Sequence, residues 1–212
     1  MTRHDRRTQI LAACLSALAG YVDALAFIKL GGFFVSFMSG NSTRLAVGLA
    51  EGSAHALVAG AIIASFVLGV ALGTLTGQAA KERRRPAVLA LVAALLAAAA
   101  ALSAADMTGA AIFAMALAMG AENAVFEREG EVSIGLTYMT GTLVKLGQRI
   151  VSALLGGDRF AWLPYLLLWM GLVLGAAIGA TVYLHIGMNG LWVAAGAAAA
   201  LAIAAARMTQ LD

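Results

Sequence analysis

A short phrase of small polar residues followed by a cation occurs twice in the chain, each time within an apolar stretch. Residues 38–45 read MSGNSTRL, and residues 139–146 read MTGTLVKL. Polar and basic side chains are costly in an apolar environment, and there they usually mark a functional site. The repeated phrase therefore predicts a binding site for a polar solute. Its candidate residues are Ser39, Gly40, Asn41, Ser42 and Arg44 in the first copy, and Thr140, Gly141, Thr142 and Lys145 in the second.

Acidic and amide side chains inside apolar segments form a second candidate group. Asp23 interrupts the first apolar segment, and Asn123, preceded by Glu122, occupies the matching place about 100 residues later. A carboxylate in such a segment is rare and usually paired, and it can also mark a proton or ion pathway. One hypothesis is therefore that these three residues couple transport to a proton or another cation.

A structural interpretation of the same acidic residues remains open beside the functional one. Asp23 could form an ion pair with Arg44 or Lys29, and Glu122 could pair with Lys145. Buried charges are stable only when they are paired in this way. The two interpretations are compatible.

Other residue types give no sign of a metal, a cofactor or a nucleotide. The three histidines, His4, His55 and His185, match no metal motif by their spacing, so we predict no metal site and no cofactor. No phosphate-binding loop is present, which favours secondary over ATP-driven transport. The net charge of +3 lies mostly in two basic clusters, and we expect no nucleic-acid partner.

The composition places these residues in a membrane. Of 212 residues, 62% are hydrophobic and only 12% are charged, whereas soluble domains are nearer one quarter charged. Alanine and glycine dominate, as is typical of closely packed membrane helices, and alternating strands are absent. The sequence predicts an all-α integral membrane protein, with residues 1–212 forming a single transmembrane domain.

The apolar segments form two similar halves. They are residues 10–29, 33–50, 55–79 and 87–105, followed by residues 109–127, 134–152, 161–184 and 188–207. We therefore predict one repeat over residues 10–105 and another over residues 109–207. The third segment of each half carries glycines four residues apart, which let helices approach closely within one chain or between copies in a homo-oligomer.

The distribution of basic residues favours six crossings over eight. Eight crossings would place Lys81–Arg85 and Arg128 outside and divide the basic residues equally, against the positive-inside rule. If residues 33–50 and 134–152 instead enter and leave by the same face, the loop and tail cations gather inside, apart from Lys29. The sequence thus predicts six transmembrane helices, two re-entrant half-helices and cytoplasmic termini. Each half then crosses three times, so the repeats must be inverted.

The predicted half-helices should meet near the middle of the membrane. Gly40 permits a sharp turn, and Asn41 or Ser42 would be a good N-cap for the helix that follows. The second copy would begin its helix in the same way after Gly141. A helix N-terminus offers free N–H groups and a positive dipole, which suit an anionic or polar group.

Several of these motifs resemble the YoaK-like family of bacterial inner-membrane proteins. The likeness covers nearly the whole chain and rests on Gly20-x-x-Asp23, on residues 31–42 and on residues 118–124 and 138–143. It implies a multi-pass protein of the bacterial inner membrane with six spans, and it implies no substrate. Relatives tend to have Gln where this chain has Glu122.

The leading hypothesis is a proton-coupled transporter or a channel for a small polar or anionic solute. Its partners would be the lipid bilayer and that solute. One alternative is a structural or assembly protein without a ligand. Another is an intramembrane serine protease that uses Ser39 and His185, although the Gly-x-Ser-Gly phrase expected of such an enzyme is absent.

Overall fold

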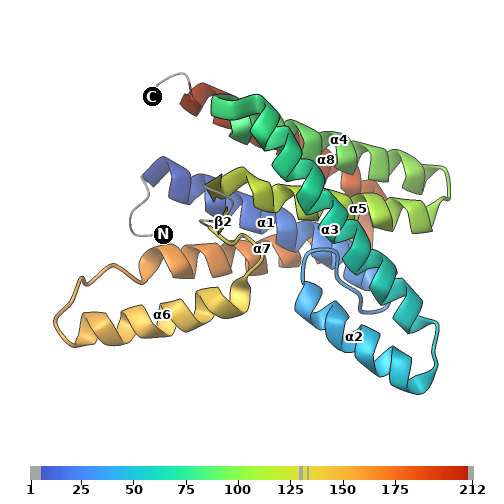
Figure 1. Cartoon of the computed structure of the whole chain (residues 1–212), viewed down its shortest axis with the longest axis horizontal. Coiled ribbons are helices and arrows are strands. Elements are labelled where there is room, and N and C mark those ends of the chain that lie inside the picture. The colour runs from blue at the N-terminus through green and yellow to red at the C-terminus, as the bar shows by residue number, and fades with distance from the viewer. Residues whose placement is uncertain (1–5, 129–130, 133, 210–212) are drawn as a thin grey trace.

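The computed structural model describes residues 6–128, 131–132 and 134–209 and consists almost entirely of helices (Figure 1). The α-helices are α1 (Arg6–Lys29), α2 (Met38–Glu51), α3 (His55–Ala80), α4 (Arg84–Ala104), α5 (Thr108–Glu122), α6 (Met139–Leu154), α7 (Leu163–Ile186) and α8 (Gly190–Thr209). Short 3-10 turns are η1 (Lys81–Arg83), η2 (Asn123–Phe126) and η3 (Gly187–Asn189), and one small hairpin pairs β1 (Glu127–Arg128) with β2 (Glu131–Val132). The predicted α-helical membrane class is confirmed.

Four continuous helical stretches are long and apolar enough to cross a membrane. They are Arg6–Lys29, His55–Ala104, Thr108–Phe126 and Leu163–Met208. A straight helix of 50 residues would be about 75 Å long, more than twice the thickness of a hydrocarbon core. The chain breaks both long stretches at a residue with positive φ, Lys81 (51°) and Gly187 (58°). Each long stretch therefore contains two helices, α3 with α4 and α7 with α8.

The bundle is built from long helix pairs that match between the two halves. Helix α1 packs along α7, and α5 packs along α3, while α4 lies against both α5 and α8. Gly20 of α1 faces the Leu172 carbonyl of α7, and Gly120 of α5 faces the Phe66 carbonyl of α3. A Cβ at either glycine would overlap that oxygen, so the close approach requires glycine at both places.

The glycines of α3 and α7 are used within the chain. Gly175 lies against the Ala17 backbone of α1, and Gly69 lies against the Leu117 backbone of α5. One turn further along, Gly179 meets Tyr21 and Gly73 meets Ala121. By these contacts, Gly69 of α3 corresponds to Gly175 of α7. Gly171 lies one helical turn before Gly175. Because these faces are occupied, they give no support to association between copies, and the homo-oligomer stays a prediction.

Helices α2 and α6 are shorter and lie outside the main bundle. They pack on α3 and α7 and extend away from a common region in opposite directions (Figure 1). Their 14 and 16 residues correspond to about 21 and 24 Å, less than the roughly 30 Å hydrocarbon core. Within α2 only Asn41 and Gly48 are buried, and within α6 only Met139 and Thr142.

Both short helices begin earlier than the sequence suggested. Phe37 is the residue before α2, so Gly40 lies inside the first turn and makes no sharp bend. The chain turns instead at Gly31 and Gly32, whose φ angles are 65° and 113°. The prediction of an N-cap at Asn41 or Ser42 is wrong, because Asn41 lies within the helix and bonds to the preceding loop.

Candidate functional site

In the first half, Asp23 holds the loop that leads into α2. The N–H groups of Val35 and Ser36 donate to Asp23 Oδ1 at 2.7 and 2.8 Å, and the Ser36 hydroxyl donates to Oδ2. All three residues are buried. Both carboxyl oxygens of Asp23 thus have donors from the loop, an arrangement that stabilises a carboxylate through oriented N–H and O–H dipoles.

Asn41 holds the same loop from the side of α2. Its Oδ1 accepts from the Phe34 N–H at 3.1 Å, and its Nδ2 donates to the Phe34 carbonyl at 2.6 Å. The side chain is completely buried. A buried amide with both ends bonded in this way fixes one residue of the loop from two sides. Asp23 and Asn41 together position the start of α2.

The described residues of the second half show a similar arrangement with fewer bonds. The Thr137 hydroxyl donates to Asn123 Oδ1 at 3.3 Å, in the place where Ser36 donates to Asp23. Asn123 Nδ2 donates to the Met119 carbonyl of its own helix at 2.9 Å. Thr142, which corresponds to Asn41, is buried, and its N–H donates to the Tyr138 carbonyl at 3.0 Å. An amide has replaced the carboxylate, and a threonine has replaced the asparagine.

The starts of α2 and α6 line one pocket of about 320 Å³. From the first half it receives Ser36, Phe37, Met38 and Ser39, and from the second half Thr137, Tyr138, Met139, Thr140 and Gly141, with Phe66 of α3. Neither helix start carries a side-chain cap among the described residues. The first N–H groups of each helix have no acceptor within that helix. The pocket therefore combines hydroxyl groups with the positive ends of two helices.

A larger groove nearby is less suited to a polar solute. It has a volume of about 490 Å³, lies between α1, α7 and the first loop, and is lined mainly by apolar side chains such as Phe27, Ile28 and Leu172. Asp23 touches this groove, but both its oxygens are bonded to the loop. The polar pocket at the two helix starts is therefore the candidate site.

Only part of the predicted binding set lines the pocket. Ser39, Thr140 and Gly141 do so, whereas Gly40, Asn41, Ser42, Arg44, Thr142 and Lys145 are not among its lining residues. The Ser42 hydroxyl donates to the Met38 carbonyl, and the Arg44 guanidinium lies 4.9 Å from the centre of the Phe33 ring. Lys145 is exposed on α6.

Comparison with known proteins agrees with this membrane architecture. A family model described as "Protein of unknown function (DUF1275)" matches residues 11–204. The chain belongs to the DUF1275 family. It is also 38% identical over 195 residues to the UPF0700 transmembrane protein RA0705 of Rhizobium meliloti (strain 1021), covering 92% of this chain and 84% of that protein. No solved structure matches. The YoaK-like resemblance is confirmed, since it denotes this same family.

The DUF1275 chain also contains a carboxyl group without a partner. Glu122 is completely buried at the end of α5, and among the described residues neither of its carboxyl oxygens has a hydrogen-bond partner. In the same part of the chain, no three His, Cys, Asp or Glu side chains gather as metal ligands.

The predicted ion pairs of this DUF1275 chain are wrong. Asp23 bonds to loop N–H groups in place of Arg44 or Lys29, because the loop folds directly over its carboxylate. Lys145 is exposed and does not reach the buried Glu122.

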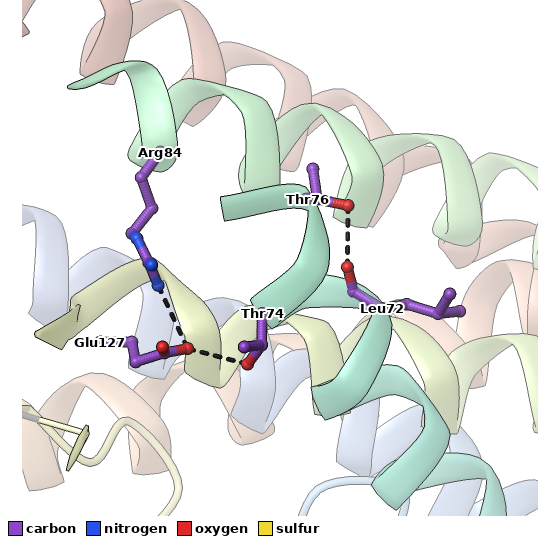
Figure 2. Close-up of polar contacts among 5 residues, drawn as sticks. All are labelled: Leu72, Thr74, Thr76, Arg84 and Glu127. Carbon is purple, nitrogen blue, oxygen red and sulfur yellow. Dashed lines mark hydrogen bonds and ion pairs between the residues drawn. The ribbon is translucent and has the colours of Figure 1, made fainter. Parts of the chain in front are cut away.

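The ion pair found within the described residues joins Arg84 to Glu127 at 3.1 Å, and the Thr74 hydroxyl also donates to Glu127 at 2.8 Å (Figure 2). It links the start of α4 to the residue that follows η2. Beside it, the Arg85 guanidinium lies 5.4 Å from the centre of the Phe126 ring. The paired cation therefore holds one end of the bundle, away from the repeated phrases.

Sequence reasoning missed the pocket residues that precede each phrase. Residues 35–41 read VSFMSGN and residues 136–142 read LTYMTGT, so the similarity begins before the two methionines. Extending the comparison by these residues would have found Ser36 and Thr137. Phe66 carries no comparable signal, because its contribution depends on how α3 packs in this family.

Proposed function

We propose that this protein is a transporter or channel for a small polar or anionic solute, which passes where the starts of α2 and α6 meet. The observation that carries the proposal is the pocket of about 320 Å³, to which both repeated phrases contribute. A solute site near the midplane, formed by broken helices from two repeats, is a common arrangement in secondary transporters.

The chemistry of the pocket supports a polar or anionic solute. Ser36, Ser39, Thr137 and Thr140 bring hydroxyl groups, which both donate and accept hydrogen bonds. The two helix starts, which carry no side-chain cap among the described residues, add N–H groups and the positive ends of two helix dipoles. A small anion or a neutral polar molecule could replace its hydration shell with these groups.

We further propose six crossings, by α1, α3, α4, α5, α7 and α8, with α2 and α6 as half-helices of two inverted repeats. In these repeats α1 corresponds to α5, and α3 corresponds to α7. The contact between α1 and α7 therefore corresponds to the contact between α5 and α3. Both pairs pack closely and use glycines at matching places. The opposite directions of α2 and α6 in Figure 1 are those expected of half-helices that enter from opposite faces.

The proposed orientation places both termini on the cytoplasmic side of the bacterial inner membrane. Arg85 donates to the Thr8 hydroxyl, which brings the start of α4 beside the start of α1. Arg84 reaches Glu127 after α5. These contacts gather the basic residues 6–7 and 81–85 at one end of the bundle, as the positive-inside rule requires.

A flux assay in vesicles tests the proposal. Full-length protein is reconstituted, and uptake of radiolabelled glycerol, formate and chloride is compared with empty vesicles. We expect faster uptake of at least one probe. Replacing two pocket hydroxyls together, Ser39→Ala with Thr140→Val, should slow that uptake by roughly tenfold, the effect of losing one or two hydrogen bonds.

A matched control separates the pocket from general effects of losing a hydroxyl group. The Thr181 hydroxyl is exposed and bonds to the Ala177 carbonyl of its own helix, so Thr181→Val should leave the flux unchanged. Uptake that does not exceed empty vesicles for any probe would favour the structural or assembly protein. The protease alternative receives no support from the Ser39 pocket, because His185 is not among its lining residues.

A further inference from the structure

The two acidic side chains at the junction of the repeats differ sharply in their hydrogen bonding. Asp23 accepts from Val35 and Ser36 through both oxygens. Glu122 is completely buried, and in the described part of the chain neither oxygen has a partner. An ionised carboxylate buried without a donor is very costly, whereas its protonated form is much less so. The geometry thus separates a hydrogen-bonded carboxyl group, Asp23, from one whose protonated form suits its surroundings, Glu122.

Among the described residues, no cation forms a hydrogen bond or an ion pair with the Glu122 carboxyl oxygens. Helix α3 carries one titratable side chain, His55, whose ring lies 5.8 Å from that of Phe33. Helix α1, which also contacts α5, carries the acidic Asp23, with Arg6 and Arg7 at its start and Lys29 at its end.

The two arginines of α4 are engaged elsewhere. Arg84 is paired with Glu127, and Arg85 lies over the Phe126 ring. Both contacts lie beyond Asn123 in the turn that follows α5. The exposed Lys145 of α6 does not reach the buried carboxyl either.

A proton suits this place better than a metal ion. Calcium and magnesium ions need several oxygen ligands, and the described residues hold no group of three acidic, histidine or cysteine side chains. One unpartnered carboxyl group can bind one proton without further ligands. The chemical class of ligand that fits is therefore the proton.

Glu122 is also connected to the pocket through its neighbour in the chain. Asn123 directly follows it and accepts a hydrogen bond from Thr137, which lines the pocket. The helix changes from α to 3-10 geometry between these two residues. A change of charge on Glu122 can therefore alter the position of Asn123 and, through Thr137, the shape of the pocket wall.

We propose that Glu122 is the proton-binding group of this protein and that its protonation state is transmitted through Asn123 and Thr137 to the pocket. Asp23 then has a structural role as the anchor of the first loop. The coupling of this proton to a solute rests on the proposed transport function, but proton binding and its effect on the pocket do not.

Infrared spectroscopy tests proton binding without any solute. Full-length protein in dodecyl maltoside, a detergent without carbonyl groups, is titrated with acid, and spectra at different pH are subtracted. We expect a high-frequency C=O band from a carboxylic acid that lacks hydrogen bonds. Glu122→Gln should abolish this band, whereas Glu51→Gln, which makes the same change at an exposed site, should retain it.

Isotope labelling keeps this test decisive even if the variant folds poorly. Labelling the carboxyl carbon of glutamate in the unmodified protein should move the band, and labelling aspartate should not. A wild-type protein without the band, a band that survives Glu122→Gln, or a band that moves with aspartate labelling would overturn the assignment.

Cysteine labelling tests transmission to the pocket. In a Cys14→Ser background, Tyr138→Cys places a thiol in the pocket, and Ser152→Cys places one on the exposed surface of α6. A helix N-terminus lowers the pKa of a thiol, so the ratio of the two maleimide labelling rates varies with pH even without Glu122. The pH profile of this ratio is therefore compared between the protein with Glu122 and Glu122→Gln, and we expect the two profiles to differ several-fold. Identical profiles would overturn the transmission, and a failed flux screen would leave both tests standing.

Discussion

The two halves of the molecule carry the same phrase but hold it in different ways. In the first half, Asp23 and Asn41 bond to the backbone of the loop before α2. In the second half, Asn123 accepts one side-chain bond from Thr137. The comparison shows that the first half anchors its loop through more hydrogen bonds among the described residues. The second half has fewer such bonds beside a buried carboxyl group that has no partner among the described residues, Glu122.

Removing the two anchors tests this difference most strongly. Asp23→Ala leaves the N–H groups of Val35 and Ser36 buried without an acceptor, and we expect it to lower the free energy of unfolding by about 4 kcal/mol. Asn123→Ala loses the bond to Thr137 and the bond to the Met119 carbonyl of its own helix, and it should lower the free energy of unfolding by only about 1 kcal/mol. Thermal or denaturant unfolding in detergent measures both. Equal losses would mean that the two loops are anchored equally well.

The sequence located these anchors without revealing what they hold. Asp23 and Asn123 stood out because polar groups are rare in apolar segments, and each accepts a hydrogen bond from the loop that leads into α2 or α6. Their partners were missed, because a carboxylate in a sequence suggests a cation, whereas the folded chain offers backbone N–H groups at a closer place. Which donor reaches a carboxylate depends on how the loop folds, and here the positive φ angles of Gly31 and Gly32 shape that loop.

The glycine contacts should behave alike in both halves. A Cβ at Gly175 would overlap the Ala17 carbonyl, and a Cβ at Gly69 would overlap the Leu117 carbonyl. Overpacking of this kind forces helices apart, so Gly175→Ala and Gly69→Ala should each lower the free energy of unfolding by about 3 kcal/mol. Gly196→Ala is the control, since a Cβ there meets open space. A large difference between Gly175→Ala and Gly69→Ala would contradict the matched packing of the halves.

The helix class and the positions of the long helices could be read from hydropathy, because burial in lipid demands long apolar helices. The starts of α2 and α6 could not, since both helices begin at a methionine without a side-chain cap. Capping residues predict a helix start only where their side chains are free. The Asn41 side chain already bonds to the Phe34 backbone, and the Ser42 hydroxyl donates to the Met38 carbonyl.

Asn41 and Thr142 occupy matching places in α2 and α6 and offer a finer comparison. Asn41→Ala removes both bonds to the Phe34 backbone, and we expect a loss of about 2 kcal/mol. Thr142→Ala removes a smaller side chain, and the bond from the backbone N–H of residue 142 to the Tyr138 carbonyl is retained. The loss of unfolding free energy should therefore stay below about 1 kcal/mol. Unfolding in detergent compares them. A larger effect at Thr142 would show that the second loop is the better anchored one.

Replacing the cation in each repeated phrase, Arg44 or Lys145, should change the free energy of unfolding least. Arg44 lies over the Phe33 ring, and its guanidinium also covers Gly32 at the turn of the first loop. Arg44→Ala should therefore lower the free energy of unfolding by about 1 kcal/mol. Lys145 is exposed on α6, so Lys145→Ala should change it by less than about 0.5 kcal/mol. If unfolding in detergent gave Lys145→Ala the larger loss, that lysine would have to hold the second loop. The contrast between an anchored first repeat and a weakly held second repeat would then fail at the position where the two phrases differ least in charge.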